Sequence, residues 1–405
     1  MLDAVVIGAG GAGLSAAISL SGFTDKFVVV TSGSVGHSNS VKAHGGIQFP
    51  VLKEDSAETH FEDSYLGGNY KASQELLRVM TRDSSNVLNW LKSLGLSFDT
   101  CGNQYIVKNC EGISVPRVLS VGLHTGSSIV KVLYSELKRR SIKIVEWATL
   151  KAVRKKEDIF HLYLSHKNND LILKSKYVIL CCGGKSKEHA EKNGYGTTNQ
   201  PVTDFQFYKS LEDIDVKFLL VDSFQYHPTC ITIRNSLFGL PVPEPLKVLG
   251  AKLYDKEGNV IQMSGLKRDE LSVKLFDAIR EGRAVKTEKT FQPSFLLDIK
   301  NILESGSIIA DSFGPFFKKL INHGVDPYKE KIPVAPMVHY QNGGIRINAQ
   351  CETSINGLYA AGEITGGIHG TDRLMGNSLL DMLVFGRIAG ESCGKIISGG
   401  LRLES

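Results

Sequence analysis

Three glycines near the start of the chain have the spacing of a nucleotide-binding turn. Gly8, Gly10 and Gly13 form the pattern G-x-G-x-x-G between an apolar, β-branched run over residues 3–7 and a helical pattern over 14–20. Glycines at these positions let the backbone turn tightly and approach a pyrophosphate, which then lies at the N-terminus of the helix. Placed after the first strand, the motif predicts a dinucleotide site; the alternative is a glycine-rich turn without a ligand.

The end of the second predicted strand bears on which dinucleotide is bound. Residues 27–30 form this strand in the prediction, and Thr31 and Ser32 follow it. An Asp or Glu at this point would hold the ribose 2′-hydroxyl of NAD. Because neither residue is present, the NAD interpretation is weakened and FAD remains open.

A late segment adds two features that suit a flavin. Residues 357–363 are predicted to form a strand that ends in the carboxylate of Glu363, which could bind ribityl hydroxyls. Farther along, Asn377 and Ser378 open a predicted helix. The partial positive charge at its N-terminus would face the pyrimidine oxygen of the flavin.

Composition limits the remaining classes of function. The chain has 405 residues with 42% hydrophobic and 22% charged residues, which indicates two or three globular domains. A net charge of +5 is too small to indicate nucleic acid or a membrane surface. The N-terminus has no basic region and no cleavage signal, so we expect no cleaved leader. No apolar run approaches about 18 residues, so we expect no spanning helix. The seven Cys lack metal or haem spacing, so we expect a reduced, cytoplasmic protein without a metal site.

Several elements are predicted to position these residues. One helix runs through the apolar positions from Leu76 to Leu94, and another covers 129–137. Alternating apolar residues between 142 and 173 predict a β meander. A third buried strand, 177–180, ends at Gly183 and Gly184.

The middle of the chain has a different character. From Thr229 to Val334, charged helical segments such as 269–280 alternate with short strands such as 295–299. We therefore predict an inserted domain at 229–334. It would interrupt a nucleotide-binding domain formed by residues 1–228 and 335–405.

In five stretches the sequence resembles the flavoprotein family of fumarate reductase, succinate dehydrogenase and L-aspartate oxidase. The stretches are residues 8–13, 38–47 (SNSVKAHGGI), 225–229 (QYHPT), 333–345 and 369–387, and their order and spacing match the family. The resemblance covers nearly the whole chain. It implies an α/β fold in which a Rossmann-like FAD-binding domain is interrupted by an α+β capping domain, with the active site between them.

The resemblance and the glycine pattern together imply the residues that bind FAD. Asn39 stands where membrane-bound members have a His that holds FAD covalently, so we expect non-covalent FAD. The chain ends soon after Arg387, so we expect no C-terminal helical domain, as in the flavin module of soluble fumarate reductases. The expected cofactor-binding residues are Gly8, Gly10, Gly11, Ala12, Gly13, Thr31, Ser32, Ser38, Asn39, Ser40, Gly45, Gly46, Gly183, Gly362, Glu363, Asn377, Ser378 and Leu379.

The resemblance also implies the groups that hold the substrate. Arg373 matches the substrate-binding Arg of the family, and His227 and His339 match the two His that hold the carboxylates of a C4 dicarboxylate. A guanidinium suits this task because its fork binds a carboxylate bidentately. Hydride would pass between flavin N5 and one carbon of the substrate, while a proton arrives at the other carbon.

An Arg of the capping domain supplies that proton in the family. Arg268, within Lys267-Arg268-Asp269, matches this donor, and Glu244 matches the Glu that returns the proton. Free guanidinium barely gives up its proton, so such a relay is required. Lys247 replaces a relay Arg, and Pro243 replaces a Thr that would bond the substrate.

Three functions follow as hypotheses. The first is interconversion of fumarate and succinate by an FAD-dependent oxidoreductase. The second is L-aspartate oxidation to iminoaspartate, which uses a Glu near the substrate ammonium; alignment places Cys110 there, and a shift of one residue places Glu111 there. The third is a non-catalytic FAD-binding dicarboxylate sensor, which would need the carboxylate-binding residues but no proton relay. Electrons must be exchanged with an iron–sulfur subunit, a reduced carrier or a quinone.

Overall fold

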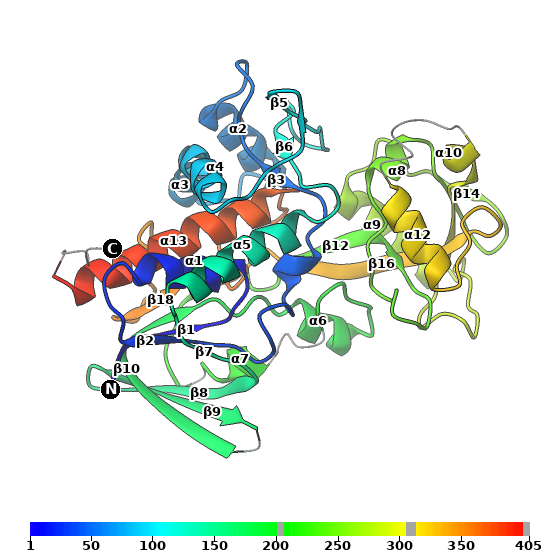
Figure 1. Ribbon diagram of the computed structural model, residues 1–405. Helices are drawn as coiled ribbons and strands as arrows, with labels where there is room; N and C mark the ends of the chain where they lie inside the picture. Colours follow the sequence, from blue (N-terminus) through cyan, green and yellow to red (C-terminus); the bar gives the residue numbers. More distant parts are fainter. Residues whose placement is uncertain (168, 201–205, 212, 305–312, 400–405) are drawn as a thin grey trace. The chain divides into compact units, whose positions relative to one another are not determined.

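The computed structural model describes residues 1–399 except 168, 201–205, 212 and 305–312. The chain divides into two compact units (Figure 1). The first unit comprises Met1–Lys185, Gln200–Phe224 and Gln341–Ser405, and the second comprises Ser186–Asn199 and Gln225–Tyr340. The inserted segment predicted at 229–334 lies inside the second unit.

A seven-stranded sheet forms the core of the first unit. Its central parallel strands are apolar and largely buried, as in β2, whose four residues FVVV are all buried. The antiparallel strands at the other edge form the predicted meander. The strand order is β7 (Ile144–Val145), β2 (Phe27–Val30), β1 (Leu2–Ile7), β10 (Asn169–Leu180), β9 (Ile159–His166) and β8 (Ala148–Lys156), with β18 (Leu358–Ala360) also paired to β10.

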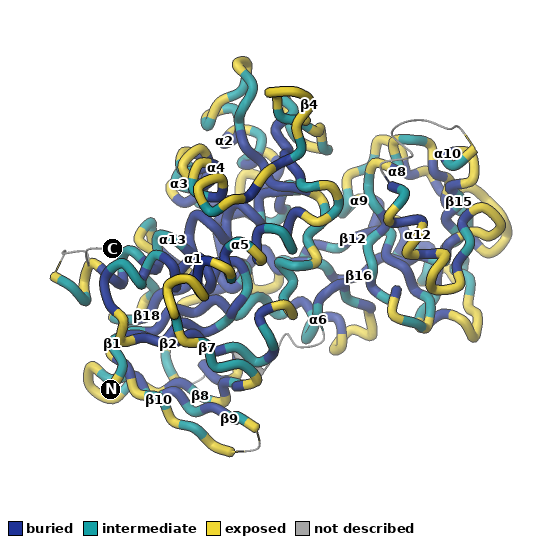
Figure 2. Tube along the Cα trace, viewed as in Figure 1, coloured by how far each residue is buried: buried dark blue, intermediate teal, exposed yellow. Residues whose placement is uncertain are grey.

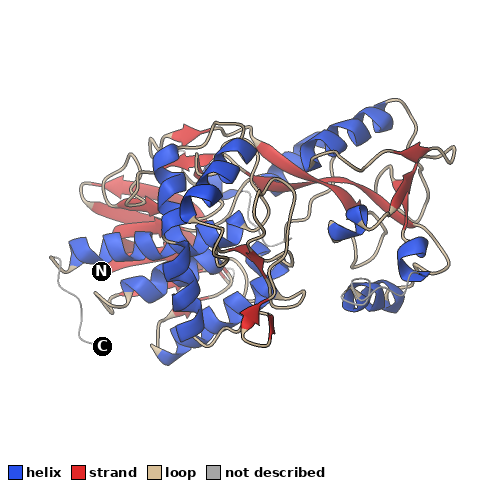
Figure 3. Cartoon of the chain, turned by 90° about the horizontal axis from the view of Figure 1, so that it is seen from above, coloured by secondary structure: helices blue, strands red, loops and turns tan. Residues whose placement is uncertain are grey.

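Three helices cover one face of this sheet (Figures 1 and 3). They are α1 (Gly11–Leu20), α5 (Thr125–Arg139) and α13 (Asn377–Ile397). Helix α1 is buried almost all round, which is typical of a helix enclosed in a core (Figure 2). Helix α13 packs closely on α1 because Gly386 and Gly390 have no side chain; a Cβ at either position would collide with the backbone of α1.

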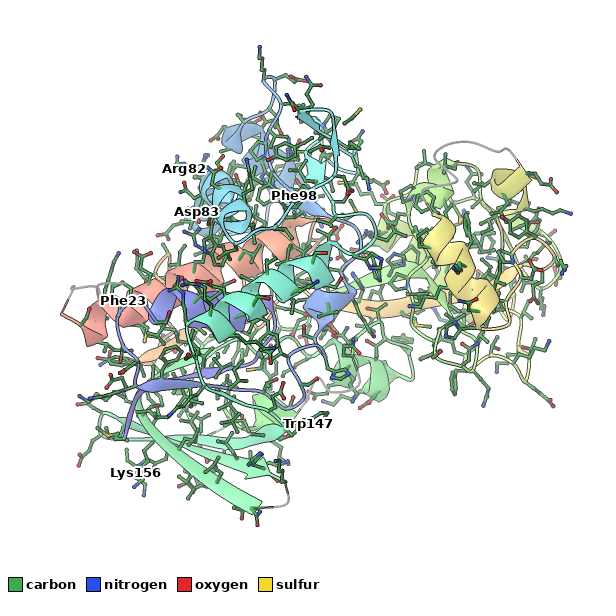
Figure 4. All side chains as sticks on the ribbon, viewed as in Figure 1. Phe23, Arg82, Asp83, Phe98, Trp147 and Lys156 are labelled. Atoms are coloured by element: carbon green, nitrogen blue, oxygen red, sulfur yellow. The ribbon has the colours of Figure 1, made fainter. Side chains whose placement is uncertain are left out.

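The predicted helix through Leu76–Leu94 consists of two helices, α3 (Gln74–Arg82) and α4 (Ser84–Ser93), so the prediction of one helix is wrong. They meet at Asp83, which is labelled in Figure 4. Ser84 Oγ donates to the carbonyl of Thr81 at 2.6 Å, and such side-chain bonds compete with the helical hydrogen bonds. Asp83 in turn accepts a bond of 3.2 Å from Arg387 of α13.

Smaller elements complete the first unit around its sheet. Helix α2 carries its own N-cap, because Ser56 Oγ accepts from the backbone of Thr59. The small elements are η1 (Asn39–Lys42), β3 (Ile47–Gln48), α2 (Ala57–Gly67), β4 (Thr100–Cys101), β5 (Gln104–Tyr105), β6 (Val118–Leu119), α7 (Gln206–Lys209), β11 (Phe218–Leu219), β17 (Gly344–Arg346) and β19 (Thr365–Gly366).

The second unit has its own five-stranded sheet and its own helices. Helix α9 buries Leu271, Leu275 and Ala278 at helical spacing, which forms the apolar stripe expected of a helix packed on a core. The sheet order is β12 (Phe224–Ile231), β16 (Ile332–Gln341), β15 (Phe295–Asp298), β13 (Lys252–Tyr254) and β14 (Val260–Ile261). The helices are α6 (Ser186–Asn193), α8 (Pro245–Val248), α9 (Arg268–Arg280), α10 (Lys300–Glu304) and α12 (Gly314–Asn322). Within the described ranges, no helix of either unit is long and apolar enough to cross a bilayer.

Candidate active site

The carboxyl ends of four parallel strands bring the expected cofactor residues to one edge of the main sheet. Ile7 at the end of β1 is level with Val30 of β2 and with Leu180 of β10, and Leu180 is level with Ala360 of β18. The segments that follow these strands contain Gly8–Gly13, which runs into the first turn of α1, and Thr31–Ser32, Gly183 and Gly362–Glu363. Ligands of open α/β sheets bind at this edge.

The glycine turn requires its glycines. Gly8 has a φ of +108°, and a Cβ there would collide with the carbonyl of Cys181. A Cβ at Gly13 would collide with the carbonyl of Gly8, so the first helix could not approach the strand that precedes it. The backbone N–H of Gly11 donates to Ser40 Oγ at 3.1 Å, which ties the turn to the segment that contains Ser38 and Asn39.

This second segment leaves a polar group for a ligand. A Cβ at Gly10 would lie 3.3 Å from Ser40 Oγ and 3.7 Å from Ser38 Cβ, so both serines lie over the glycine turn. Ser38 Oγ is buried and has no hydrogen-bond partner among the described residues. Asn39 Oδ1 accepts from the backbone of Gln200 at 2.9 Å. An orphaned hydroxyl beside a glycine turn of this kind fits the pyrophosphate of FAD.

The remaining expected cofactor residues lie on turns around the same sheet. Glu363 Oε1 accepts from the backbone of Gln341 at 3.1 Å, which orients the carboxylate. Gly46, Gly183 and Gly362 have positive φ of +110°, +83° and +80°. A Cβ at Gly45 would lie 3.0 Å from the sulfur of Met375, next to the first turn of α13, which holds Asn377, Ser378 and Leu379.

The second unit brings four expected catalytic residues together. His227 on β12 and His339 on β16 have ring centroids 5.7 Å apart, with the ring planes inclined at 68° to each other. Glu244 precedes α8, and its carboxylate lies 4.0 Å from His227 Nε2. Arg268, the first residue of α9, donates from Nε to the same carboxylate oxygen of Glu244. Side-chain exposures of 13% for Arg268 and 21% for Glu244 mark a largely desolvated ion pair.

The charges in this cluster are fixed by their surroundings. Burial by itself would raise the pKa of Glu244, but the charge of Arg268 and its hydrogen bond lower this pKa to about 2. Burial, assisted by the positive charge of Arg268, lowers the pKa of His227 to about 4. At neutral pH the cluster therefore contains a carboxylate, a guanidinium and a neutral imidazole. His227 Nδ1 is buried without a hydrogen-bond partner in the described ranges.

Lys247 lies beside this cluster and differs from the relay Arg expected in the family. Its Nζ donates to the carbonyl of Leu266 at 2.7 Å. Lys247, Glu244 and Thr229 line a cavity of about 20 Å³ whose other walls are mostly apolar. This volume accommodates one water molecule, which could hydrogen-bond to these polar groups.

Arg373 completes the expected catalytic residues, and two unexpected residues contact His339. Arg373 belongs to the first unit; it is 5% exposed, and its Nη1 donates to the carbonyl of Leu374 at 3.2 Å. Sequence reasoning missed Thr198, whose hydroxyl lies 2.8 Å from His339 Nδ1, and Asn199, which donates to the His339 carbonyl at 3.1 Å. No motif marks these two residues, because they contact His339 only through the fold.

The neutral state of His227 predicts a loss of stability in acid. The pKa is near 6.5 in an unfolded chain and about 4 in the folded protein, so the unfolded state binds protons first. The stabilisation is complete above pH 6.5 and is lost as the pH falls towards 4, by about 3 kcal/mol in total. We expect the melting temperature of the protein to fall from pH 7 to pH 5 by circular dichroism, and to fall less in His227→Gln. Equal pH dependence of the two proteins would contradict this assignment.

Comparison with known proteins identifies the family. A family model described as an FAD binding domain matches residues 3–379. The chain belongs to this family. An L-aspartate oxidase of Synechocystis is 29% identical over 95% of this chain and 69% of its own length. A protein of Methanothermobacter marburgensis, named as one subunit of the CoM/CoB fumarate reductase, is 27% identical over 97% of this chain and 72% of its own length.

Solved structures share the fold. The E. coli quinol fumarate reductase FrdA superposes with a TM-score of 0.85 at 24% identity, covering all of this chain and 72% of that chain. Mycobacterium smegmatis Sdh1 superposes with a TM-score of 0.84 at 26% identity, covering 98% of this chain and 68% of that chain. The resemblance inferred from the five sequence stretches is confirmed. The chain is an FAD-dependent oxidoreductase of the fumarate reductase, succinate dehydrogenase and L-aspartate oxidase family.

Proposed function

We propose that the protein interconverts fumarate and succinate. The observation that carries this proposal is the buried ion pair of Arg268 and Glu244 beside His227 and His339. Reduction of the C=C bond of fumarate requires one hydride and one proton, which add to the two alkene carbons. When bound, FAD supplies the hydride from N5 and is left oxidised.

Arg268 supplies the proton in this proposal. Its guanidinium gives a proton to the alkene carbon that becomes a carbanion centre, and the pKa of Arg opposes this transfer. The ionised carboxylate of Glu244 accepts a hydrogen bond from Arg268, which orients the guanidinium and keeps it charged until the substrate takes the proton. Reprotonation passes back through Glu244, and Lys247 or a water in the adjoining cavity links Glu244 to solvent.

The histidines and Arg373 hold the two carboxylates of the substrate. His227 and His339 lie close enough for one carboxylate to contact both rings. We assign Arg373 to a substrate carboxylate because it lies in the family motif His369-Gly370-Thr371-Asp372-Arg373. Pro243 offers no hydroxyl where a family Thr would bond the substrate, so we expect a higher KM than that of a site with a threonine at this position.

FAD is bound without a covalent bond in this proposal. Asn39 carries an amide where a histidyl linkage would need a nucleophilic ring nitrogen, and its oxygen is engaged by the backbone of Gln200. Precipitation of the yellow protein with trichloroacetic acid should leave all of the flavin absorbance in the supernatant. Flavin that stays in the pellet would contradict the proposal.

L-Aspartate oxidation is the second candidate. It is favoured by the relatives of that name at 29% identity, whereas the Glu expected near a substrate ammonium is matched ambiguously by Cys110 and Glu111. A dicarboxylate sensor has less support, because family membership and the Arg268–Glu244 pair both favour turnover.

One experiment separates the candidates. The flavin is reduced anaerobically with dithionite, and fumarate is added while its absorbance is recorded. Rapid reoxidation with formation of succinate supports the proposal. L-Aspartate is offered in parallel to the oxidised flavin, because aspartate oxidases can also reduce fumarate. Bleaching by L-aspartate favours the second candidate, and failure of both reactions contradicts the proposal.

A separate protein exchanges electrons with this chain in vivo. The relative from Methanothermobacter is named as one subunit of a fumarate reductase, and such a name denotes a protein that has further subunits. We propose that the partner is an iron–sulfur subunit, with a reduced carrier or a quinone as the alternative. Reduction of the flavin by each donor under anaerobic conditions distinguishes them.

A further inference from the structure

His60 is a buried histidine outside every motif discussed so far. It lies on α2, is 0% exposed, and its Nε2 lies 2.8 Å from Oδ1 of Asn377, the first residue of α13. The amide nitrogen of Asn377 donates to Ser64 Oγ at 2.8 Å. Since His60 and Ser64 are one helical turn apart, both polar atoms of the Asn377 side chain are held by α2.

The direction of this hydrogen-bond chain is fixed. Asn377 Oδ1 can only accept, so His60 carries its proton on Nε2 and leaves Nδ1 as an acceptor. His60 Nδ1 is buried and has no partner among the described residues, so a second proton there would be buried without an acceptor. Burial accordingly lowers the pKa of His60 to about 4. The histidine is neutral at pH 7 and donates to Asn377 in one orientation.

Other contacts fix the backbone just before α13. Gln48 is 0% exposed, and its Nε2 donates to the carbonyl of Met375 at 2.6 Å. Gly376 has a φ of +91°, and a Cβ there would lie 3.0 Å from Gln48 Cγ. Gln48 Oε1 is buried without a partner in the described part of the chain. This acceptor next to the helix start can receive a hydrogen bond from a donor of a bound ligand.

We propose that His60 and Ser64 are positioning residues that hold Asn377, and with it the first turn of α13, in place for the pyrimidine ring of FAD. The inference rests on the proposed function only in that FAD is the ligand. The start of α13 carries a partial positive charge, which stabilises the negative charge that a flavin gains on reduction. A helix start that is free to shift provides less of this stabilisation, so His60 raises the reduction potential of the flavin.

The test compares His60→Leu, which removes the donor at similar volume, with His60→Gln, whose amide restores a donor. We expect FAD affinity to fall about tenfold in His60→Leu and the two-electron potential to fall by about 30 mV, the equivalent of a tenfold change. His60→Gln should recover most of both losses. Fluorescence titration measures the affinity, and anaerobic titration against a reference dye measures the potential.

Two further variants keep the test decisive. Ser64→Ala removes the other end of the chain and should shift the potential in the same direction by a smaller amount; it replaces His60→Leu if that variant fails to bind FAD. His166→Leu, at the end of β9, is the control and should leave the potential unchanged. An unchanged flavin potential in His60→Leu overturns the inference. If His60→Leu binds no FAD, an unchanged potential in Ser64→Ala overturns it instead. All these measurements are made without substrate. If the wild-type protein binds FAD but does not react with fumarate, the proposed function is contradicted, whereas the inference about His60 can still be tested.

Discussion

Arg268→Gln should reduce fumarate at least about 10³-fold more slowly than the wild-type protein, because the variant lacks the proton donor. General acids contribute about 10²–10⁴-fold to rates, and the nearby ammonium of Lys247 is already hydrogen-bonded to the carbonyl of Leu266. Two further groups of the cluster are Glu244, which is ionised, and His227, which is neutral and has a pKa of about 4. Both lack an available proton of suitable acidity at pH 7.

The measurement separates the proton step from the rest of the reaction. Flavin reduction by dithionite needs no proton from Arg268, so its rate should be unchanged, whereas reoxidation by fumarate should nearly stop. Arg280→Gln is the matched control, since Arg280 ends the same helix α9 with a side chain that is 74% exposed. Reoxidation by fumarate at more than a tenth of the wild-type rate in Arg268→Gln would exclude Arg268 as the donor.

Gly13→Val should abolish FAD binding. A Cβ at this position would collide with the backbone carbonyl of Gly8, which cannot rotate away as a side-chain end could. The N-terminus of α1 would have to leave the end of β1, and the pyrophosphate-binding turn would lose its shape. We expect a colourless protein whose FAD affinity has fallen at least about a hundredfold, which corresponds to about 2.7 kcal/mol.

The control for this change is another glycine of the first unit. A Cβ at Gly36 would meet no atom within 4 Å, and the φ of Gly36 is not positive, so Gly36→Ala should remain yellow. Fluorescence titration with FAD and the far-ultraviolet circular dichroism of both variants are the readouts. Retention of FAD by a folded Gly13→Val protein would show that the turn does not bind the pyrophosphate.

The sequence by itself determined the first strands, the glycine turn and the family. Apolar runs without polar interruption mark β1 and β2, because parallel strands are buried on both faces and show no alternation. The glycines at 8 and 13 mark the turn, because only glycine allows the close approach that the structure shows there. Five short stretches were enough to identify the flavoprotein family.

Tertiary structure decided which residues meet. Arg268 and Glu244 are 24 residues apart, and His227 and His339 are 112 residues apart, so no local pattern shows that they are in contact. The helix break at Asp83 depends on a serine hydroxyl and on a bond to Arg387 of α13, which local periodicity cannot reveal. No motif in the sequence gives His60 a role. Its role appears only when α2 packs on the start of α13, because a buried hydrogen bond needs a partner that the fold alone supplies.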